Sequence, residues 1–386
     1  MYGARELRAL GLVLLMIIST QIGVISNLDF NSKDMPDGIQ TFFASNADVE
    51  IITLGGDSAC AIGTNQKMKC WGDGLFGKTG HGNTEDYGDE ELEMGRYLHF
   101  TDVGESLTFL DIAIGSTFSC ALTNDSAIRC WGENDKLGSI SGTSGSGAIG
   151  DGYLEMGLNI DTVNMGTWNG TSVDAGSSHA CAIVNNGTND SLICWGGNTA
   201  GQLGLGHTNT IGDDSGDLVE GELPHVDLPE RGAITNVALG NDHTCVLWSD
   251  GQIGCWGDNS QGQLGIGNTN TIGDESDEMG TNLVLVDLPS SRTATAITAG
   301  NDFTCAIFDD TTASCWGDGA NGRLGSGSTG DLGDESDEIG DNLNILSLGN
   351  GLGVSSFDAG ESHICAILTN NQLKCWGYNG FGQLGY

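Results

Sequence analysis

Hydrophobic and polar residues alternate over short stretches of this chain, and turn-forming residues separate the stretches. The pattern is clear where an apolar run, LVLVDLP (283–289), ends at a proline and ATAITAG (294–300) alternates up to a glycine. Two further stretches, TCAIFDD (304–310) and TASCWG (312–317), flank a tight turn. Short alternating stretches bounded by Gly, Asp and Asn are typical of antiparallel strands. This part of the chain therefore predicts four consecutive strands.

The same unit recurs six times along the chain. Each copy contains the tripeptide Cys-Trp-Gly, and its tryptophans are separated by 60, 64, 61, 60 and 60 residues. A Gly-x-x-x-x-Cys element precedes each tripeptide, and a Gly-Gln-Leu-Gly turn or a variant of it follows. Four strands per repeat are typical of the blades of a β-propeller. The repeat tryptophans are Trp71, Trp131, Trp195, Trp256, Trp316 and Trp376.

The beginning of the repeat region fits the same frame. IQTFF (39–43) takes the place of the first strand of a repeat, and VEIITLGG (49–56) takes the place of the second. Residues 39–386 are thus expected to form an all-β propeller of six, or seven, four-stranded antiparallel blades. Closure of the ring would bring its two ends side by side.

The first residues of the chain have the features of a targeting segment. Arg5 and Arg8 precede an uncharged apolar run over residues 9–25. A basic region followed by a short apolar run is typical of a secretory signal, although a run of this length also suits an uncleaved membrane anchor. Residues 1–26 are therefore expected to be a signal peptide or N-terminal anchor, with a buried helix as the alternative. The polar residues 27–38 are expected to be a linker.

The repeat signatures resemble those of the regulator-of-chromosome-condensation repeat family. The resemblance rests on the Gly-x-x-[His/Phe]-x-Cys-Ala element, the Trp-Gly that closes a hairpin and the Gly-Gln-Leu-Gly turn, and it covers about 90% of the chain. It implies a β-propeller, typically of seven blades. Two interpretations of the count of six stay open, a six-bladed ring or a chain that continues beyond Tyr386. The family includes exchange factors, ubiquitin-ligase relatives and a secreted inhibitor, so the resemblance does not specify a function.

The twelve cysteines form six pairs, each within one repeat. Five pairs are separated by ten residues, and the third pair has three more residues at its hairpin tip, NNGTND (185–190). In a hairpin these positions lie opposite each other, within reach of a disulfide. With an export signal, this spacing predicts one disulfide per repeat rather than twelve buried thiols or a zinc site. The pairs are Cys60 with Cys70, Cys120 with Cys130, Cys181 with Cys194, Cys245 with Cys255, Cys305 with Cys315, and Cys365 with Cys375.

Acidic residues concentrate in five loops, which we call the arms. The chain has 52 Asp and Glu against 13 Lys and Arg, a net charge of −39, which argues against nucleic acid or an anionic membrane surface as a direct partner. A solvated rim explains the arms most simply. Calcium is the sharper hypothesis and the one candidate cofactor, with Asp274, Glu275, Asp277, Glu278, Asp334, Glu335, Asp337 and Glu338 as ligands. The arms are residues 87–95, 149–157, 211–221, 272–280 and 332–340.

Catalytic motifs are missing from the sequence. It contains no nucleophile elbow, P-loop or His-Glu-x-x-His motif. His179, His243 and His363 share one repeat position with Phe118 and Phe303, and this exchange indicates a packing role.

Asn-x-Ser/Thr sequons, the acceptor sites of N-linked glycosylation, occur at four positions. They lie at Asn124, Asn169, Asn186 and Asn189.

Two functions from different classes are consistent with these patterns. The favoured one is an exported propeller without catalysis of its own, which binds a protein partner or acts in adhesion through its rim loops. It would be secreted or held at the cell surface, touching the membrane only through an uncleaved N-terminal segment. The alternative is a guanine-nucleotide exchange factor for a small GTPase, as in nuclear relatives of the family. An enzyme such as a lyase is a third and weaker hypothesis.

Overall fold

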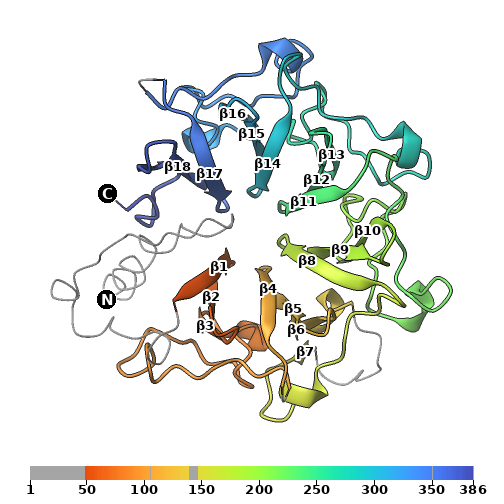
Figure 1. Ribbon diagram of the computed structural model, residues 1–386, viewed down its shortest axis with the longest axis vertical. Helices are drawn as coiled ribbons and strands as arrows, with labels where there is room; N and C mark the ends of the chain where they lie inside the picture. Colours follow the sequence, from red (N-terminus) through yellow and green to blue (C-terminus); the bar gives the residue numbers. More distant parts are fainter. Residues whose placement is uncertain (1–47, 105, 139–146, 350, 386) are drawn as a thin grey trace.

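The computed structural model describes residues 48–104, 106–138, 147–349 and 351–385, and here the chain forms six antiparallel sheets around a common centre (Figure 1). Each sheet is made of strands that follow one another in the sequence. The strands are β1 (Val49–Gly55), β2 (Ser58–Gly63), β3 (Met68–Gly72); β4 (Phe109–Ile114), β5 (Phe118–Thr123), β6 (Ile128–Glu133), β7 (Ala148–Ile149); β8 (Asn169–Ala175), β9 (His179–Asn185), β10 (Asp190–Gly196); β11 (Ile234–Leu239), β12 (His243–Trp248), β13 (Ile253–Gly257); β14 (Ala294–Ala299), β15 (Phe303–Phe308), β16 (Ala313–Gly317); β17 (Val354–Ala359), β18 (His363–Leu368), β19 (Leu373–Gly377).

Short 3₁₀ helices interrupt the connections between these sheets. Several of them lie at the outer edge of the ring, where the arms turn back toward the sheets (Figure 1). They are η1 (Leu75–Gly77), η2 (Asn134–Lys136), η3 (Gly157–Asn159), η4 (Ser215–Asp217), η5 (Gly280–Asn282), η6 (Ala320–Gly322) and η7 (Gly340–Asn342).

The hairpin formed by the second and third strands of each sheet carries its disulfide. In β12 and β13, Cys245 lies directly opposite Cys255, and the two Cα atoms are 4.1 Å apart. The longer hairpin of β9 and β10 keeps Cys181 opposite Cys194, because its three extra residues lie at the tip. The other bonded pairs are Cys60 with Cys70, Cys120 with Cys130, Cys305 with Cys315, and Cys365 with Cys375. All six predicted pairs are therefore confirmed as disulfides, and no cysteine is free.

The first of the four strands predicted for each repeat is largely absent from the described sheets. Residues 283–289 contact β13 through one bridge, Leu285 to Gly254, and one further hydrogen bond from Val286 N to Ile253 O. The backbone of this segment is shared with the next repeat, since Gly340 N donates to Asp287 O at 2.9 Å. One bridge and one further hydrogen bond are too few to form a continuous ladder with β13. Only one described sheet has four strands, and its β7 contains two residues.

The repeat tryptophans join each sheet to the preceding one. Trp256 Nε1 donates to the carbonyl oxygen of Gln202, in the Gly-Gln-Leu-Gly turn of the preceding repeat, at 3.0 Å. The same bond recurs from Trp316 to Gln263 at 3.0 Å. The last glycine of each turn must lack a side chain, because a Cβ on Gly204 would lie 2.7 Å from Trp256 Nε1. The tryptophan and the turn, one repeat apart in sequence, therefore form one contact.

Other members of this series continue or break the pattern. Trp131 donates to Lys78 O and Trp376 to Arg323 O, both at 2.9 Å. Trp195 is fully buried, yet its Nε1 has no hydrogen-bond partner among the described residues. The turn before it reads Asp-Lys-Leu-Gly (135–138) and lacks the first glycine.

The shared histidine and phenylalanine position packs between neighbouring sheets. His243 is buried, and its Nε2 lies 2.9 Å from Thr304 Oγ1 in the next sheet. That hydroxyl donates its own proton to Gln263 O, so the histidine must be the donor. Burial lowers the pKa of His243 to about 4, and the ring is neutral near pH 7. The predicted packing role is supported, with an added hydrogen bond.

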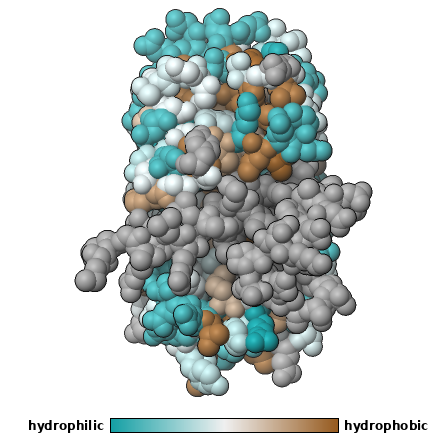
Figure 2. Space-filling model, turned by 90° about the vertical axis from the view of Figure 1, so that its left-hand side faces the viewer, coloured by the Kyte–Doolittle hydropathy of each residue, from teal (hydrophilic) through white to brown (hydrophobic). Residues whose placement is uncertain are grey.

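The last sheet is more exposed than the others. β19 is exposed or half-buried throughout, whereas the equivalent β13 and β16 are fully buried. Leu373 of β19 retains 40% of its surface and Phe381 retains 62%. Hydrophobic and hydrophilic residues lie side by side on the described part of this edge of the ring (Figure 2). Residues 39–43, which were predicted to form the first strand of the first repeat, lie outside the described residues.

The N-terminal signal or anchor (1–26) and the linker (27–38) also lie outside the described residues. Within the part of the chain that the structure describes, no helix is long and apolar enough to cross a membrane.

Removal of one disulfide tests how much these bridges stabilise the fold. The double variant Cys305→Ala with Cys315→Ala opens a loop of about ten residues and should lose roughly 2–3 kcal/mol of unfolding free energy, because the unfolded chain regains conformational freedom. Guanidinium unfolding under oxidising conditions measures the loss. The same comparison in excess reductant provides the control, since the difference between variant and wild type should shrink there. Equal stability of the two proteins without reductant would contradict a stabilising role for this bridge.

Candidate functional site

Each acidic arm begins where the third strand of a sheet ends. Gly257, which closes the Cys-Trp-Gly of β13, forms a bridge with Ile272 at the start of the fourth arm. The corresponding bridges are Gly72 to Tyr87, Gly196 to Ile211 and Gly317 to Leu332, and in the second arm Gly132 pairs with Ile149 of β7. The five arms therefore occupy equivalent places, at one end of the third strand in five sheets.

One carboxylate in every arm accepts hydrogen bonds from the backbone of its own loop. Glu278 Oε2 accepts from Gly273 N at 2.7 Å and from Glu275 N at 3.1 Å. The acceptor always lies five residues after the glycine that opens the arm. The other four acceptors are Glu93, Glu155, Asp217 and Glu338. This recurring acid stabilises the arm as a loop, a role that the sequence pattern did not reveal.

The proposed calcium ligands are divided between this structural role and the solvent. Glu278 and Glu338 bind backbone groups. Burial raises the pKa of Glu338, and the neighbouring Asp334 adds to the effect. Glu275, Asp277, Glu335 and Asp337 are exposed, and Asp274 and Asp334 are half-buried. In the described ranges, no three His, Cys, Asp or Glu side chains lie close enough together to hold a metal ion. Calcium binding stays a prediction from the sequence that this arrangement does not favour.

Large apolar side chains project from the tips of the acidic arms. In the second arm, Tyr153 retains 90% of its surface and Leu154 retains 74%, and Leu158, just beyond the arm, retains 78%. Leu92 of the first arm is 69% exposed and Val219 of the third is 58% exposed. Apolar residues gathered on an exposed loop are typical of a surface that contacts a partner. The sequence pattern marked the arms only as acidic, because it does not show which apolar residues stay exposed.

Carboxylates also lie near the centre of the ring, on the inner strands. Asp174 of β8 accepts a hydrogen bond from Leu239 N of the next inner strand at 3.1 Å, and Asp111 of β4 accepts one from Val173 N at 3.2 Å. Loss of contact with bulk solvent raises the pKa of Asp174 to about 7, and the charges of Asp111 and Asp358 add to this. The same loss raises the pKa of Asp111 and of Asp358 to about 6.

Uncharged residues make the equivalent inter-strand bonds elsewhere in the ring. Asn236 Oδ1 accepts from Ile297 N at 3.4 Å, and Thr298 Oγ1 accepts from Ala359 N at 3.2 Å. The inner strands β4, β8, β11, β14 and β17 are thus joined by side-chain acceptors. A carboxylate is not required for the bond, so the charge of Asp174 is a cost that the fold tolerates near pH 7.

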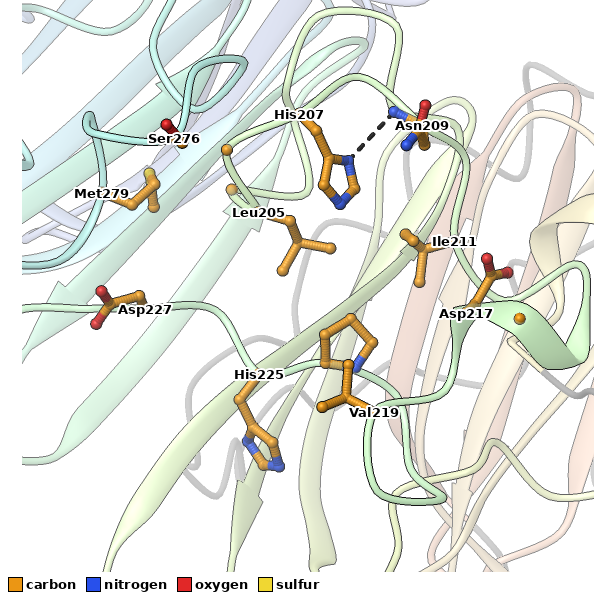
Figure 3. Close-up of a pocket in the computed structure, with 14 residues that line it drawn as sticks. Leu205, His207, Asn209, Ile211, Asp217, Val219, His225, Asp227, Ser276 and Met279 are labelled. Carbon is orange, nitrogen blue, oxygen red and sulfur yellow. Dashed lines mark hydrogen bonds between the residues drawn. The ribbon is translucent and has the colours of Figure 1, made fainter.

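A cavity of about 550 Å³ lies between the third-repeat loops and the fourth arm (Figure 3). His207, Asp217 and His225 line one part of it, and Ser276 and Met279 of the fourth arm line another. Two of its polar side chains already have partners within the loops. Asp217 accepts from three backbone N–H groups, and His207 Nδ1 accepts from Asn209 N at 3.2 Å. These two side chains therefore serve the loops themselves.

His225 is held in a polar contact beside this cavity. Its Nδ1 lies 2.7 Å from Ser191 Oγ, its Nε2 lies 3.5 Å from Glu222 Oε1, and the Trp168 ring packs against it. Burial lowers the pKa of His225 although Glu222 acts in the opposite direction, so the contact with Glu222 is not a full ion pair near pH 7. Neither Ser191 nor Glu222 lines the cavity, and the three residues do not present a nucleophile there.

A ring of antiparallel β-meanders joined by tryptophan–turn contacts defines a propeller-type repeat protein. Comparison with known families places it more narrowly, because two sequence profiles of the Regulator of chromosome condensation (RCC1) repeat match the chain. The first matches residues 109–136, 171–202, 234–263 and 354–383, and the second matches 189–247 and 250–307. The chain belongs to the RCC1 repeat family, which confirms the resemblance seen in its motifs.

Curated relatives share the repeat region and differ in length. The Ultraviolet-B receptor UVR8 of Arabidopsis thaliana is 25% identical over 346 residues, which cover 78% of this chain and 72% of the receptor. A bifunctional serine/threonine-protein kinase/NEDD4-like E3 ubiquitin-protein ligase of Dictyostelium discoideum is 27% identical over 381 residues, 88% of this chain. The E3 ubiquitin-protein ligase HERC2 of Homo sapiens is 26% identical over 74% of this chain. The chain spans only 19% and 5% of these two ligases.

Solved structures show the same fold at low sequence identity. Human WBSCR16 has a TM-score of 0.62 at 16% identity, over 88% of this chain and 79% of that one. Prp20p from Saccharomyces cerevisiae has a TM-score of 0.58 at 16% identity, over 81% of this chain and 67% of that one. These neighbours establish the propeller fold and say nothing about the ligand of this chain.

The variant Asp174→Asn tests the charge at the centre of the ring. A pKa raised from 3.8 to about 7 means that folding favours the protonated acid, so the contribution of Asp174 to stability is greatest below pH 4 and falls as pH rises toward and through 7. Asparagine keeps the acceptor for Leu239 N and removes the charge. The variant should exceed the wild type by about 1–2 kcal/mol at pH 8, allowing for screening by solvent.

Urea unfolding at pH 4, 6 and 8 measures this difference, which should disappear at pH 4. The exposed Asp337→Asn provides the control and should follow the wild-type curve at every pH. A variant that is less stable than wild type at pH 8 would show that the carboxylate, and not merely an acceptor, is needed here.

The variant Glu278→Ala tests the structural role of the acidic arms. Loss of the acceptor for Gly273 N and Glu275 N should lower the unfolding free energy by about 1–2 kcal/mol in the presence of EDTA, whereas Glu275→Ala should be neutral. If Glu278→Ala is as stable as wild type in EDTA, its backbone contacts do not support the arm.

The same samples test the calcium prediction against sodium chloride of equal ionic strength. A metal site would be established if calcium raises the wild-type melting temperature beyond this control and the rise is lost in Asp274→Asn/Asp277→Asn.

Proposed function

We propose that this protein is an exported, disulfide-bonded scaffold that binds a protein partner through its acidic arms and has no catalytic activity of its own. The observation that carries the proposal is the group of exposed apolar residues on and beside the second arm, Tyr153, Leu154 and Leu158. Three large apolar side chains within six residues are costly to leave in water. Burial against a partner removes that cost.

The charge around these residues indicates the kind of partner. The second arm also contains Asp151 and Glu155, and burial together with their mutual repulsion raises the pKa of Asp151. Opposite charge on a partner would relieve this repulsion and speed association. The expected partner surface is therefore apolar at its centre, with Lys or Arg at its edge.

Six bridges in one chain support the export part of the proposal. Disulfides persist in oxidising compartments and are rare in the cytosol. Every described sheet contains one bridge, which is expected of a framework rather than of a redox site. The basic and apolar N-terminal segment of the sequence agrees with this interpretation. We also propose a ring of six blades, because six repeats form six sheets.

Binding of a partner can be tested by comparing two matched triple variants. The arm variant Tyr153→Ala/Leu154→Ala/Leu158→Ala removes the exposed apolar group, and Leu110→Ala/Val284→Ala/Leu373→Ala removes exposed apolar residues that are scattered over the ring. Immobilised wild-type protein is used to capture proteins from the extracellular fluid of its source, with quantification by mass spectrometry. A partner captured by wild type and by the scattered variant should fall at least tenfold on the arm variant.

Equal capture by both variants would contradict a binding role for the second arm. The exchange-factor alternative is tested separately with a small GTPase that carries a fluorescent nucleotide. Nucleotide release accelerated at micromolar concentrations of this protein would favour that alternative over the scaffold.

A further inference from the structure

All four sequons of the chain lie at hairpin turns or strand starts in two neighbouring sheets. Asn124 lies between β5 and β6, Asn169 is the first residue of β8, and Asn186 and Asn189 lie in the turn from β9 to β10. All four asparagines are exposed. We infer that each of these three places, the two hairpin turns and the start of β8, carries an N-linked glycan, and that the glycans gather on one face of the ring. The inference rests on the export part of the proposed function.

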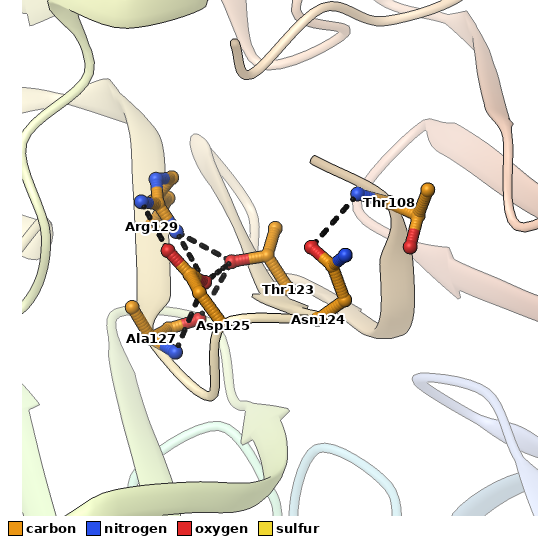
Figure 4. Close-up of polar contacts among 6 residues, drawn as sticks. All are labelled: Thr108, Thr123, Asn124, Asp125, Ala127 and Arg129. Carbon is orange, nitrogen blue, oxygen red and sulfur yellow. Dashed lines mark hydrogen bonds and ion pairs between the residues drawn. The ribbon is translucent and has the colours of Figure 1, made fainter. Parts of the chain in front are cut away.

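The turn at Asn124 shows an acceptor asparagine held in place from one side (Figure 4). Its Oδ1 accepts from Thr108 N at 3.2 Å, which fixes the amide plane. The adjacent Asp125 is held separately by Arg129, with a contact of 2.8 Å between Nη2 and Oδ2. Among the described residues, none of the four sequon Nδ2 groups donates a hydrogen bond. A sugar attached to Nδ2 would therefore displace no bond of the folded protein.

The turns at Asn124 and Asn169 lie next to each other. Gly170 N donates to Ser126 O at 2.9 Å, which joins the residue after Asn169 to the last residue of the Asn124 sequon. In the longer third hairpin, Asn186 Oδ1 accepts from Thr188 N and Asn189 N at 3.0 Å. Three extra residues at this tip raise it above the sheet without moving the disulfide below. The sequons therefore form a group and are not scattered.

This group faces away from the acidic arms. β6 begins at Ile128, next to the Asn124 turn, and ends at Glu133, which pairs with Ala148 at the start of the second arm. A six-residue strand is roughly 17 Å long, so the sequon turn and the arm lie at opposite ends of the sheet. Glycans on the sequon face would cover that face and leave the apolar tip of the second arm open.

The chemistry requires a lipid-linked oligosaccharide as co-reactant. Nδ2 of the asparagine forms a bond to the anomeric carbon of the first sugar, and the bond from that carbon to a polyprenyl diphosphate oxygen breaks. The polyprenyl diphosphate leaves with the electron pair, and Nδ2 loses one proton to a base of the membrane-bound transferase. The sequon hydroxyl, from Ser126 in the first turn, marks the acceptor for this enzyme.

The chain also contains matched controls at equivalent turns. Asn65 lies in the turn between β2 and β3, and Asn370 lies in the turn between β18 and β19. Both are exposed, but neither is followed two residues later by Ser or Thr. They should remain unmodified. The change Lys67→Thr would create a sequon at Asn65 and should add one glycan.

The experiment produces the full chain in cultured eukaryotic secretory cells, with its own N-terminal segment or with a foreign leader in place of residues 1–26. Partial digestion with a peptide N-glycosidase, followed by intact mass measurement, counts the glycans. We expect at least three steps, and Asn124→Gln, Asn169→Gln or Asn186→Gln/Asn189→Gln should each remove one of them. Ser126→Ala should match Asn124→Gln, whereas Asn65→Gln should change nothing.

The two versions separate failure of this inference from failure of the proposed function. A secreted, disulfide-bonded protein whose mass the glycosidase does not change would overturn the glycan inference and leave export standing. Glycans on the foreign-leader version, with the native version retained in the cytosol, would support the asparagines as acceptors and contradict export. Steps that Asn124→Gln, Asn169→Gln and Asn186→Gln/Asn189→Gln all leave unchanged would also overturn the inference.

Discussion

From the second repeat onward, the indole of each repeat tryptophan packs against the turn of the preceding repeat, and the order of the ring depends on this contact. Where the Trp256 N–H meets Gln202 O, the adjacent Gly204 leaves the space that the ring of the indole fills. Both partners are set by short motifs about one repeat apart, although the Trp195 N–H has no acceptor among the described residues. A single sheet of three strands cannot bury a core alone. The tryptophan contact brings neighbouring sheets close enough to share one.

Charge is placed unevenly between the core, the arms and the centre of the ring. Between the sheets, buried positions are filled mainly by apolar residues, by disulfides and by neutral histidines such as His179, whose pKa burial lowers to about 3. Acidic residues are pushed to the arms at the outer edge or to the centre of the ring, as with Asp174. At both places a carboxylate accepts backbone hydrogen bonds, yet its charge is only partly compensated. Two buried cations also have anionic partners, since Lys78 pairs with Asp73 at 2.7 Å and Arg323 pairs with Asp318 at 2.9 Å.

Local patterns predicted much of this structure, and contacts between repeats account for what they missed. Alternation predicted the strand that became β14, and cysteine spacing predicted the hairpin register of Cys245 and Cys255. The first strand predicted for the repeat 283–316 is reduced to one bridge and one hydrogen bond to β13, a contact with the preceding repeat that no pattern within one repeat reveals. The sequence contains a hint of the hydrogen bond between His243 and Thr304. His179 and His243 each bond to a threonine, Thr244 or Thr304, in the second strand of the following sheet. The sequence showed Glu278 as one of several acids of its arm, but only the structure shows that its carboxylate accepts hydrogen bonds from Gly273 N and Glu275 N.

The molecule has two different ends along the third strand of its sheets, and this asymmetry underlies the proposed scaffold. One end carries the arms with Tyr153 and Leu154, and the other carries the sequon turns. The proposed scaffold requires above all that this ring is built for an oxidising compartment. A non-reducing peptide map of the protein taken from its own source, with thiols blocked at lysis, tests this requirement. We expect six bridged peptides, each joining the two cysteines of one hairpin, and no blocked thiol. Twelve blocked cysteines would contradict the proposal.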